Sequence, residues 1–380
     1  MSDPAPPVVT PDRASARAFV ERWVRPRAAE FDRTGAVPDE VLRAVADAGL
    51  WAPFLPASSG GADVSMVELG ALHEEVGRGC SSVRSLLTVH TMVTWAVHRW
   101  ATPDQRTRWL PELATGRVRG AFCLTEPGGG GSDGARLRTT AVRTGSGWSV
   151  TGVKKWITGA RTAGLFLVFA ATDTGPVPFL VPRDAAGVHV RPIDYILGTR
   201  GSMLGEVELR DVHVDADALV GPASFSPGMV MTGALDLGRY SVAAGSVGIV
   251  QACLDACVAF TSRREVAGQP LRDLHLIRAK VTDMVTDVTA GRLLYERAGR
   301  LKDDRDPETI MATWLAKYFA STAAARHASE AVQIHGADGC GADEPVERYY
   351  RDAKIMEIIE GSTEIQRITI ADHAYREAPL

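Results

Sequence analysis

The chain has 380 residues, which at roughly 100–200 residues per domain allows two or three domains. Hydrophobic residues make up 45% of the chain and charged residues 23%, the composition of an ordinary globular protein. With 42 Lys and Arg residues against 46 Asp and Glu residues, the net charge is -4, which argues against a nucleic-acid partner bound through bulk positive charge.

The cysteines and histidines predict neither disulfides nor a metal site. The five cysteines are an odd number without a C-x-x-C pair, so we expect free thiols in a reducing cytoplasm. The nine histidines include no H-x-x-x-H spacing. We find no run of about 18 uninterrupted apolar residues and no secretory signal, so we expect a cytoplasmic protein without a membrane span. Only six basic residues are lysines, which indicates a GC-rich bacterial genome.

The N-terminal part of the chain, from Arg13 to about Gly116, has a helical pattern. In 40–50 apolar residues recur every three or four positions, and Gly49 is a typical C-terminal stop. Thr102 is expected to cap a further short helix.

The pattern changes to short β-like runs between about Ala121 and Val220. Gly, Pro and Asp separate these runs, which favours a sandwich or barrel of several short strands. We expect strands within 142–153 (two, around a Gly-Ser-Gly turn), 165–170, 177–181, 188–193 and 205–214.

The C-terminal part is helical again. Long helices are expected at 230–264, 274–301 and 307–335, with a short one after Gly361, and together they predict a four-helix bundle. The chain is therefore an α+β protein whose domains we place at 1–119 (helical), 120–224 (β-barrel or sandwich) and 225–380 (helical bundle).

Two segments are candidates for holding a flat, phosphate-bearing cofactor. The Gly-rich turn after Thr125-Glu126-Pro127 exposes N–H groups that can cradle a phosphate or the polar edge of a ring, although a flexible turn has the same composition. In Lys155-Trp156-Ile157-Thr158, an indole can stack on a ring while a hydroxyl binds its edge. The alternative is a core Trp with a satisfied Thr.

Glu360 is a candidate general base. It follows two isoleucines and precedes Gly361, and a carboxylate in apolar surroundings has the raised pKa that such a base needs. The alternative is a carboxylate that caps the helix starting near Ser362.

These segments together resemble the acyl-CoA dehydrogenase family. The similar stretches occur in family order over nearly the whole chain: Leu124-Thr125-Glu126-Pro127, Gly131-Ser132-Asp133, Lys155-Trp156-Ile157-Thr158, Leu235-Asp236-Leu237-Gly238-Arg239, Arg264 with Gly268-Gln269-Pro270-Leu271, Gln333-Ile334-His335-Gly336, and Glu360-Gly361. The Gly run before Ser132 is one residue longer than is usual, and His275 stands where the family commonly has Gln.

The resemblance implies an FAD site at the domain junction, in a homodimer or homotetramer. The residues implied to touch FAD within one subunit are Phe122, Leu124, Thr125, Gly131, Ser132, Trp156, Ile157 and Thr158. Those implied to reach a neighbouring subunit's FAD are Arg264, His275, Gln333 and Gly336, while Ser362, Thr363 and Glu364 hold its pyrophosphate–adenine side. The implied substrate contacts are Ser132, Asp236, Arg239 and Gly361.

The chemistry that the resemblance implies is dehydrogenation of an acyl thioester. Glu360 removes the α-proton while a β-hydride passes to flavin N5. The Glu360 N–H and a flavin hydroxyl stabilise charge on the thioester oxygen. The implied electron acceptor is electron-transfer flavoprotein.

Arg84 is a clue to the acyl group. It lies on an apolar helix, where an ion pair with Glu74 or Glu75, or snorkelling to water, is one explanation. The other is that the segment is similar to the glutaryl-CoA dehydrogenase pattern, in which Arg84 and Thr88, four residues apart on one face, bind a distal carboxylate.

The segment Cys80-Ser81-Ser82-Val83-Arg84-Ser85 also resembles carrier-protein-linked dehydrogenases that make hydroxymalonyl or methoxymalonyl polyketide extender units. This resemblance favours a small polar or acidic acyl group on an acyl carrier protein. The alternatives are a short-chain or glutaryl-type acyl-CoA dehydrogenase of catabolism, a flavin monooxygenase on the same fold, and a non-catalytic acyl-binding protein.

Overall fold

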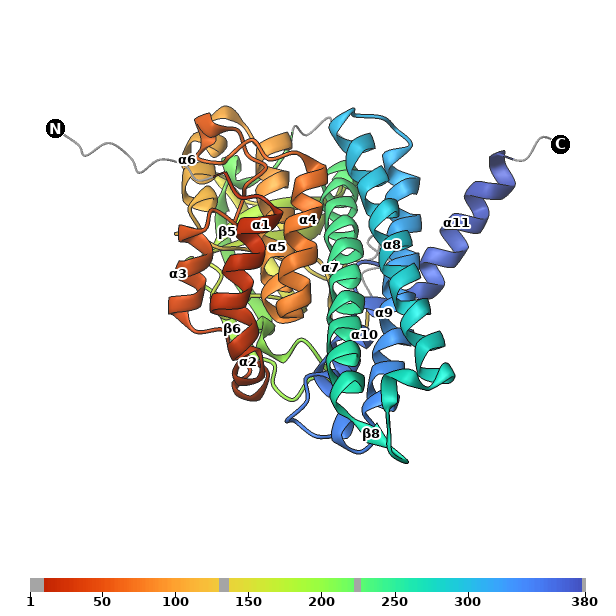
Figure 1. Ribbon diagram of the computed structural model, residues 1–380. Coiled ribbons are helices and arrows are strands. Elements are labelled where there is room, and N and C mark those ends of the chain that lie inside the picture. Colours follow the sequence, from red (N-terminus) through yellow and green to blue (C-terminus); the bar gives the residue numbers. More distant parts are fainter. Residues whose placement is uncertain (1–9, 130–136, 222–226, 378–380) are drawn as a thin grey trace.

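The computed structural model describes residues 10–129, 137–221 and 227–377. Within these ranges helices come first, a sheet follows and helices return, so the predicted α, β, α order is confirmed. In Figure 1 the N-terminal helices, in red and orange, lie beside the long helix α7, in green, and the strands lie behind them.

Two boundaries of the N-terminal helices lie where the sequence predicts them, the end of α3 near Gly49 and the start of α6 after Thr102. Gly49 turns the chain at φ 67° after α3, and the Thr102 hydroxyl accepts a hydrogen bond from the backbone N of Gln105 (3.2 Å), which caps α6. The helices are α1 (Arg13–Phe19), α2 (Ala28–Thr34), α3 (Asp39–Asp47), α4 (Met66–Gly79), α5 (Ser81–Trp100) and α6 (Pro103–Ala114).

The expected strands, together with β1, which the sequence did not predict, form a single seven-stranded mixed sheet. Its order is β1-β4-β2-β3-β7-β6, and β5 pairs with β4 in antiparallel fashion. β1 runs parallel to β4, and the segment that follows β1 reaches the second half of β3, where the Lys155 backbone N donates to the Thr125 oxygen. The strands are β1 (Gly120–Cys123), β2 (Thr140–Arg143), β3 (Gly147–Ile157), β4 (Leu165–Thr172), β5 (Gly175–Pro182), β6 (Val188–Pro192) and β7 (Gly205–Asp215).

The C-terminal helices contain one element that the sequence did not predict, α10. α7 and α9 pack against each other and against α8 and α10, whereas α11 packs on α9 and projects from the rest of the chain (Figure 1). The elements are α7 (Pro227–Arg263), β8 (Glu265–Val266), β9 (Gln269–Pro270), α8 (His275–Asp303), α9 (Thr309–His335), α10 (Val346–Ile358) and α11 (Thr363–Glu377).

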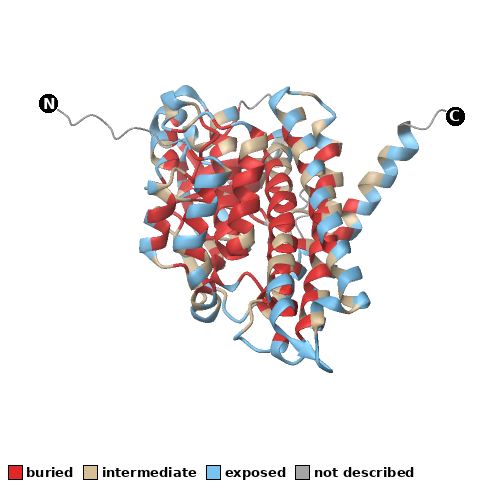
Figure 2. Cartoon of the chain, viewed as in Figure 1, coloured by how far each residue is buried: buried red, intermediate tan, exposed pale blue. Residues whose placement is uncertain are grey.

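α7 is the central helix of the core. By length and composition alone it is apolar enough to cross a membrane, but 67% of its most apolar window is buried inside the fold. One continuous apolar cluster includes residues of α4, α5 and α7 to α10, and buried positions gather along these helices in Figure 2. This packing fixes α5, α7, α9 and α10 around one point of the interior.

Candidate active site

Glu360 lies where α5, α7, α9 and α10 come together, between the end of α10 and the start of α11. Its φ is 55°, a left-handed conformation that costs a residue with a side chain of the order of 1–3 kcal/mol. Arg239 donates from Nε to the Glu360 carbonyl oxygen (3.1 Å), and the Gln366 amide donates to the same oxygen (3.3 Å). Long-range contacts therefore hold the strained turn.

The carbonyl group of the next residue, Gly361, accepts a hydrogen bond from a buried cation. Lys317 on α9 is 0% exposed and donates from Nζ to the Gly361 oxygen (2.7 Å). Burial lowers the pKa of Lys317 to about 8, although the nearby Glu360 carboxylate favours its charged form. Helices α7, α9 and α11 thus each contribute one donor to the backbone at Glu360 and Gly361.

One oxygen of the Glu360 carboxyl group is buried without a fixed partner, although the residue as a whole is partly exposed. Its Oε2 atom is inaccessible to solvent and has no hydrogen-bond partner among the described residues. Burial raises the pKa of Glu360 to about 7, while the positive charges of Arg239, Lys317 and Arg84 pull it downward. A carboxyl group that titrates near neutrality and points into a buried space is suited to proton abstraction.

Gly238 on α7 makes room for this carboxyl group. A Cβ atom at Gly238 would lie 2.6 Å from Glu360 Oε2 and 2.8 Å from Met92 Sδ. No side chain fits there without displacing the carboxylate, so the glycine in the Leu235–Arg239 motif has a steric role.

The two substrate positions predicted on α7 lie on either side of Gly238. The Arg239 guanidinium stacks over the Trp314 ring at 4.1 Å from its centroid, a cation–π contact. Asp236 forms an ion pair with the buried Lys302, and its Oδ1 atom is buried with no described partner. Arg239 also touches the Glu360 turn, so it positions the candidate base whatever its role toward substrate.

Arg84 on α5 is a buried cation without a carboxylate partner. It is 1% exposed, and no ion pair within 4.0 Å joins it to a carboxylate of the described residues. Its Nη1 donates to Thr88 Oγ1 (2.9 Å), Nη2 lies 2.9 Å from Met356 Sδ, and Nε has no partner. Burial lowers the pKa of Arg84 to about 10, and the Glu360 and Asp352 carboxylates oppose this shift.

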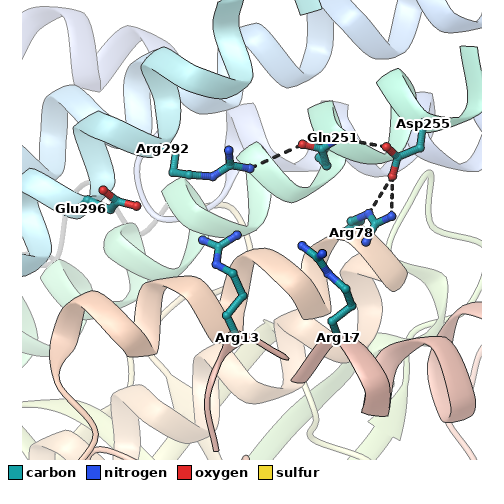
Figure 3. Close-up of a pocket in the computed structure, with 7 residues that line it drawn as sticks. All are labelled: Arg13, Arg17, Arg78, Gln251, Asp255, Arg292 and Glu296. Carbon is teal, nitrogen blue, oxygen red and sulfur yellow. Dashed lines mark hydrogen bonds and ion pairs between the residues drawn. The ribbon is translucent and has the colours of Figure 1, made fainter. Parts of the chain in front are cut away.

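The expected alternative, an ion pair to Glu74 or Glu75, is wrong. Glu74 and Glu75 pair instead with arginines from α1, α4 and α8, and these arginines line a cavity of about 430 Å³ (Figure 3). Glu74 binds Arg13 and Arg292, and Glu75 binds Arg13, Arg17 and Arg78. The Arg84 side chain does not reach water either, so neither solvent nor a carboxylate of the described residues neutralises its charge.

Trp156 lies at an exposed strand end and fits a planar cofactor. Its side chain is 52% exposed, its φ is 61°, and Thr158 follows within two residues. The Lys155 backbone N donates to the Thr125 oxygen (2.8 Å), which places the predicted Thr125 contact beside the indole. A large exposed ring next to two hydroxyls is the arrangement that a flavin ring would cover.

A buried ion pair fixes the two strands that carry these residues. Lys154 Nζ binds Glu126 Oε1 (2.8 Å) and the Leu124 carbonyl oxygen (3.1 Å). The second Glu126 oxygen accepts from the backbone N of Arg138 (2.6 Å), across the Gly-rich turn. Gly131 and Ser132 lie outside the described residues.

The other predicted FAD contacts fall into three groups. The side chains of Phe122, Leu124 and Ile157 are buried, so they contribute main-chain atoms and support to the platform. Arg264, His275, Gln333 and Gly336 are exposed at one end of the bundle, near β8 in Figure 1. Ser362, Thr363 and Glu364 begin α11. No hydrogen bond in the described ranges links the bundle-end group to Trp156 or Glu360.

Sequence reasoning missed the residues that hold the base from other helices. The family motif Leu235–Arg239 includes Gly238, but the sequence did not indicate its steric role. No motif pointed to Lys317 or Gln366. A lysine within the Ala-rich run of α9 is a signal of a buried, functional charge, because lysine is almost never fully buried unless paired.

Three family models together span nearly the whole chain. They are described as "Acyl-CoA dehydrogenase, N-terminal domain", over residues 12–117, "Acyl-CoA dehydrogenase, middle domain", over 121–212, and "Acyl-CoA dehydrogenase, C-terminal domain", over 228–375. The mitochondrial short-chain specific acyl-CoA dehydrogenase of Homo sapiens is 35% identical over 371 residues, covering 95% of this chain and 89% of that protein.

Solved structures agree. FkbI, for biosynthesis of the methoxymalonyl extender unit of the polyketide Fk520, has 34% identity and a TM-score of 0.88, covering 97% of this chain and 100% of that one. A glutaryl-CoA dehydrogenase of Mycobacterium smegmatis in complex with FADH2 has 29% identity and a TM-score of 0.91, covering 97% and 94%. The chain belongs to the acyl-CoA dehydrogenase family, FAD-dependent oxidoreductases that act on CH–CH bonds.

Proposed function

We propose that Glu360 is the base that removes the α-proton of an acyl thioester. The observation that carries this assignment is the Glu360 Oε2 atom, buried without a partner in a group whose pKa burial raises to about 7. FAD, when bound, supplies the acceptor for the β-hydrogen. The chain's own residues hold the base, exclude water from it and orient the acyl chain.

The proposed cofactor site combines the Trp156 platform with residues of a second copy. Phe122, Leu124, Thr125, Ile157 and Thr158 complete the proposed platform, and we infer that Gly131 and Ser132, which lie outside the described residues, also touch FAD. Arg264, His275, Gln333, Gly336, Ser362, Thr363 and Glu364 reach FAD in a homodimer or homotetramer. Arg264, His275, Gln333 and Gly336 are exposed at the end of the bundle in one chain, which supports this division.

We propose that the substrate is a small acyl group with a polar or acidic end. Arg84 supports this, because a buried guanidinium without a carboxylate partner favours an acidic group nearby. Thr88, Asp236, Arg239 and Gly361 complete the proposed substrate site. Similarity to FkbI supports a role in polyketide extender-unit biosynthesis, and we propose that an acyl carrier protein presents the acyl group.

The main competing function is a short-chain or glutaryl-type acyl-CoA dehydrogenase, which the curated relatives support equally. A flavin monooxygenase on this fold has no use for an α-proton base, and Glu360 speaks against it. We place the enzyme in the cytoplasm of a bacterium, with electron-transfer flavoprotein as acceptor.

The base assignment is tested with Glu360→Gln, which preserves shape but does not accept a proton. We expect the variant to retain bound FAD and to lose flavin reduction by at least about a hundredfold, since a positioned base contributes 10²–10⁴-fold. The assay is anaerobic bleaching of the flavin with a panel of CoA and carrier-protein thioesters. Retention of more than about a tenth of the wild-type rate would contradict the assignment.

A further inference from the structure

Arg84 is the end of a buried hydrogen-bonded chain that crosses three helices. Thr88 Oγ1, which accepts from Arg84 Nη1, lies 2.6 Å from Ser241 Oγ on α7. Ser241 Oγ in turn lies 2.8 Å from Nδ1 of His73 on α4. Thr88, Ser241 and His73 are each no more than 3% exposed. Water therefore does not substitute for any member of the chain.

Each hydroxyl group in this hydrogen-bonded series has an acceptor for its proton, whichever way the hydrogen bonds run. If Thr88 donates to the Arg84 carbonyl oxygen (2.9 Å), then Ser241 donates to Thr88 and His73 donates to Ser241. If Thr88 donates to Ser241 instead, then Ser241 donates to His73. In both cases Ser241 fixes the rotamer of the hydroxyl on which Arg84 depends.

Apart from Thr88, few groups hold the Arg84 guanidinium in place. Its Nε atom is buried without a partner, and Met356 provides only a weak sulfur acceptor. Gly245 allows the stem to lie against α7, because a Cβ atom there would be 2.7 Å from Arg84 Cδ. Burial and the Arg84 charge lower the pKa of His73 to about 3, so the imidazole is neutral and does not repel the guanidinium.

We propose that Ser241, held by His73, is a positioning residue that orients Arg84 through Thr88 and thereby sets the preference for acyl groups with an acidic end. This inference rests on the proposed role of Arg84 toward substrate. Ser241 and His73 form no hydrogen bond to Glu360, so they act on selectivity rather than on proton abstraction.

The test compares Ser241→Ala, Arg84→Met and the double variant in the holoenzyme, with glutaryl-CoA and butyryl-CoA as substrates. For Ser241→Ala we expect kcat/KM on glutaryl-CoA to fall about three- to tenfold, mainly through KM, the range of one buried hydrogen bond. On butyryl-CoA we expect less than about a twofold change. In the Arg84→Met background, Ser241→Ala should not change kcat/KM on either substrate, because the guanidinium that Ser241 orients is absent.

The chain offers a matched control on the same helix. Ser246 is 0% exposed and its hydroxyl has no described partner, so Ser246→Ala removes a similar group without breaking this chain of hydrogen bonds. Ser241→Thr, which retains a hydroxyl, should restore the glutaryl preference. If Ser241→Ala does not fold, Ser241→Cys provides a weaker hydrogen bond and should show a smaller loss in the same direction.

The outcomes separate this inference from the proposed function. If Arg84→Met lowers kcat/KM on glutaryl-CoA but not on butyryl-CoA, whereas Ser241→Ala affects both substrates equally or neither, the positioning role is wrong and the Arg84 role stands. If Arg84→Met lowers kcat/KM equally on both substrates, or if the wild type turns over only butyryl-CoA, the proposal of an acidic acyl group is wrong. The positioning role of Ser241 is then overturned with it.

Discussion

The turn at Glu360 combines an unfavourable backbone conformation with a buried carboxyl group. Neither is stable alone, and both are held by donors from α7, α9 and α11 that bind the carbonyls of Glu360 and Gly361. Strain of this kind persists where the surrounding structure over-determines it. The arrangement fixes the carboxyl group without hydrogen-bonding it, which leaves Oε2 free to accept a proton.

This geometry predicts the pH dependence of catalysis. The base acts as a carboxylate, and its folded pKa is raised to about 7, so the rate of flavin reduction should rise with pH through about 7 and level off above it. Stopped-flow reduction measured from about pH 5 to about pH 9 provides the check. A rate that is flat or falls over this range would show that another group limits proton removal.

Gly238 provides a steric test of the same carboxyl group. Gly238→Ala places a methyl group within 2.8 Å of both the Glu360 carboxyl group and Met92 Sδ, and one side must move. We expect kcat to fall by about 10²-fold, the cost of a misplacement of about 1 Å, while FAD binding and fold persist.

The control is Gly145→Ala, because a Cβ atom at Gly145 meets nothing within 4 Å. Its activity should match the wild type. Wild-type kcat in Gly238→Ala would mean that the carboxyl group lies elsewhere in the working enzyme.

At the residue scale, the sequence predicted which carboxylate to consider but not how it is held. Apolar neighbours and the family motif led to Glu360. Two of the three donors that hold the turn, Arg239 and Lys317, lie 121 and 44 residues from the carbonyls that they bind, a distance at which side-chain convergence depends on helix packing. Arg84 is the opposite case, because its place on an apolar helix was expected, whereas its burial without a carboxylate partner became visible only with the ion pairs of Glu74 and Glu75.

Among the elements, the ends of β1 and β3 depend on the buried Lys154–Glu126 pair. Lys154→Met leaves the Glu126 carboxylate buried without its cation, and breaking such a pair costs about 3–5 kcal/mol. We expect a lower melting temperature and weaker FAD retention, since the same pair holds the strands that carry Thr125 and Trp156.

The matching surface variant is Arg117→Met. Arg117 pairs with Glu112 at 2.9 Å, but both side chains are solvent-accessible, and pairs of this kind contribute about 0–1 kcal/mol. Thermal unfolding of both variants and their FAD content distinguish the two cases. Equal stability of the two variants would mean that the Lys154 pair is not needed to hold these strands.

Most elements followed from local signals, and the exceptions have physical reasons. Turn residues marked the strands, and Thr102 marked the start of α6. α10 was missed because its buried face is partly polar: Asp352 is 2% exposed and accepts a hydrogen bond from the backbone N of Thr199. The parallel pairing of β1 with β4 was not predictable either, because strand partners are chosen by long-range packing.

For the whole molecule, the exposed group at the bundle end predicts a flavin site shared between two copies. Trp156→Ala and Arg264→Ala should each bind FAD poorly when made alone. Coexpressed as a mixed dimer, one site carries both substitutions and the other carries neither. We therefore expect recovery of about half of the sites in mixed dimers, because closed symmetric oligomers place the same surfaces at each interface.

FAD content and flavin reduction of the purified mixed dimer measure this recovery. The wild type should also be oligomeric by sedimentation at micromolar concentration. Either a wild-type monomer that retains FAD or mixed dimers without recovered sites would contradict a shared site.

The distribution of thiols has a practical consequence for following that assembly. Cys80, Cys123, Cys253 and Cys257 are buried, whereas Cys340 is exposed. Burial raises the pKa of Cys123 and of Cys257 to about 12, so both remain unreactive thiols in the folded chain. Cys340 ends a short 3-10 turn that follows Gly336, within the bundle-end group. A thiol-reactive dye would therefore label the natural chain at one place, and quenching of its emission by a neighbouring flavin would report subunit docking in real time.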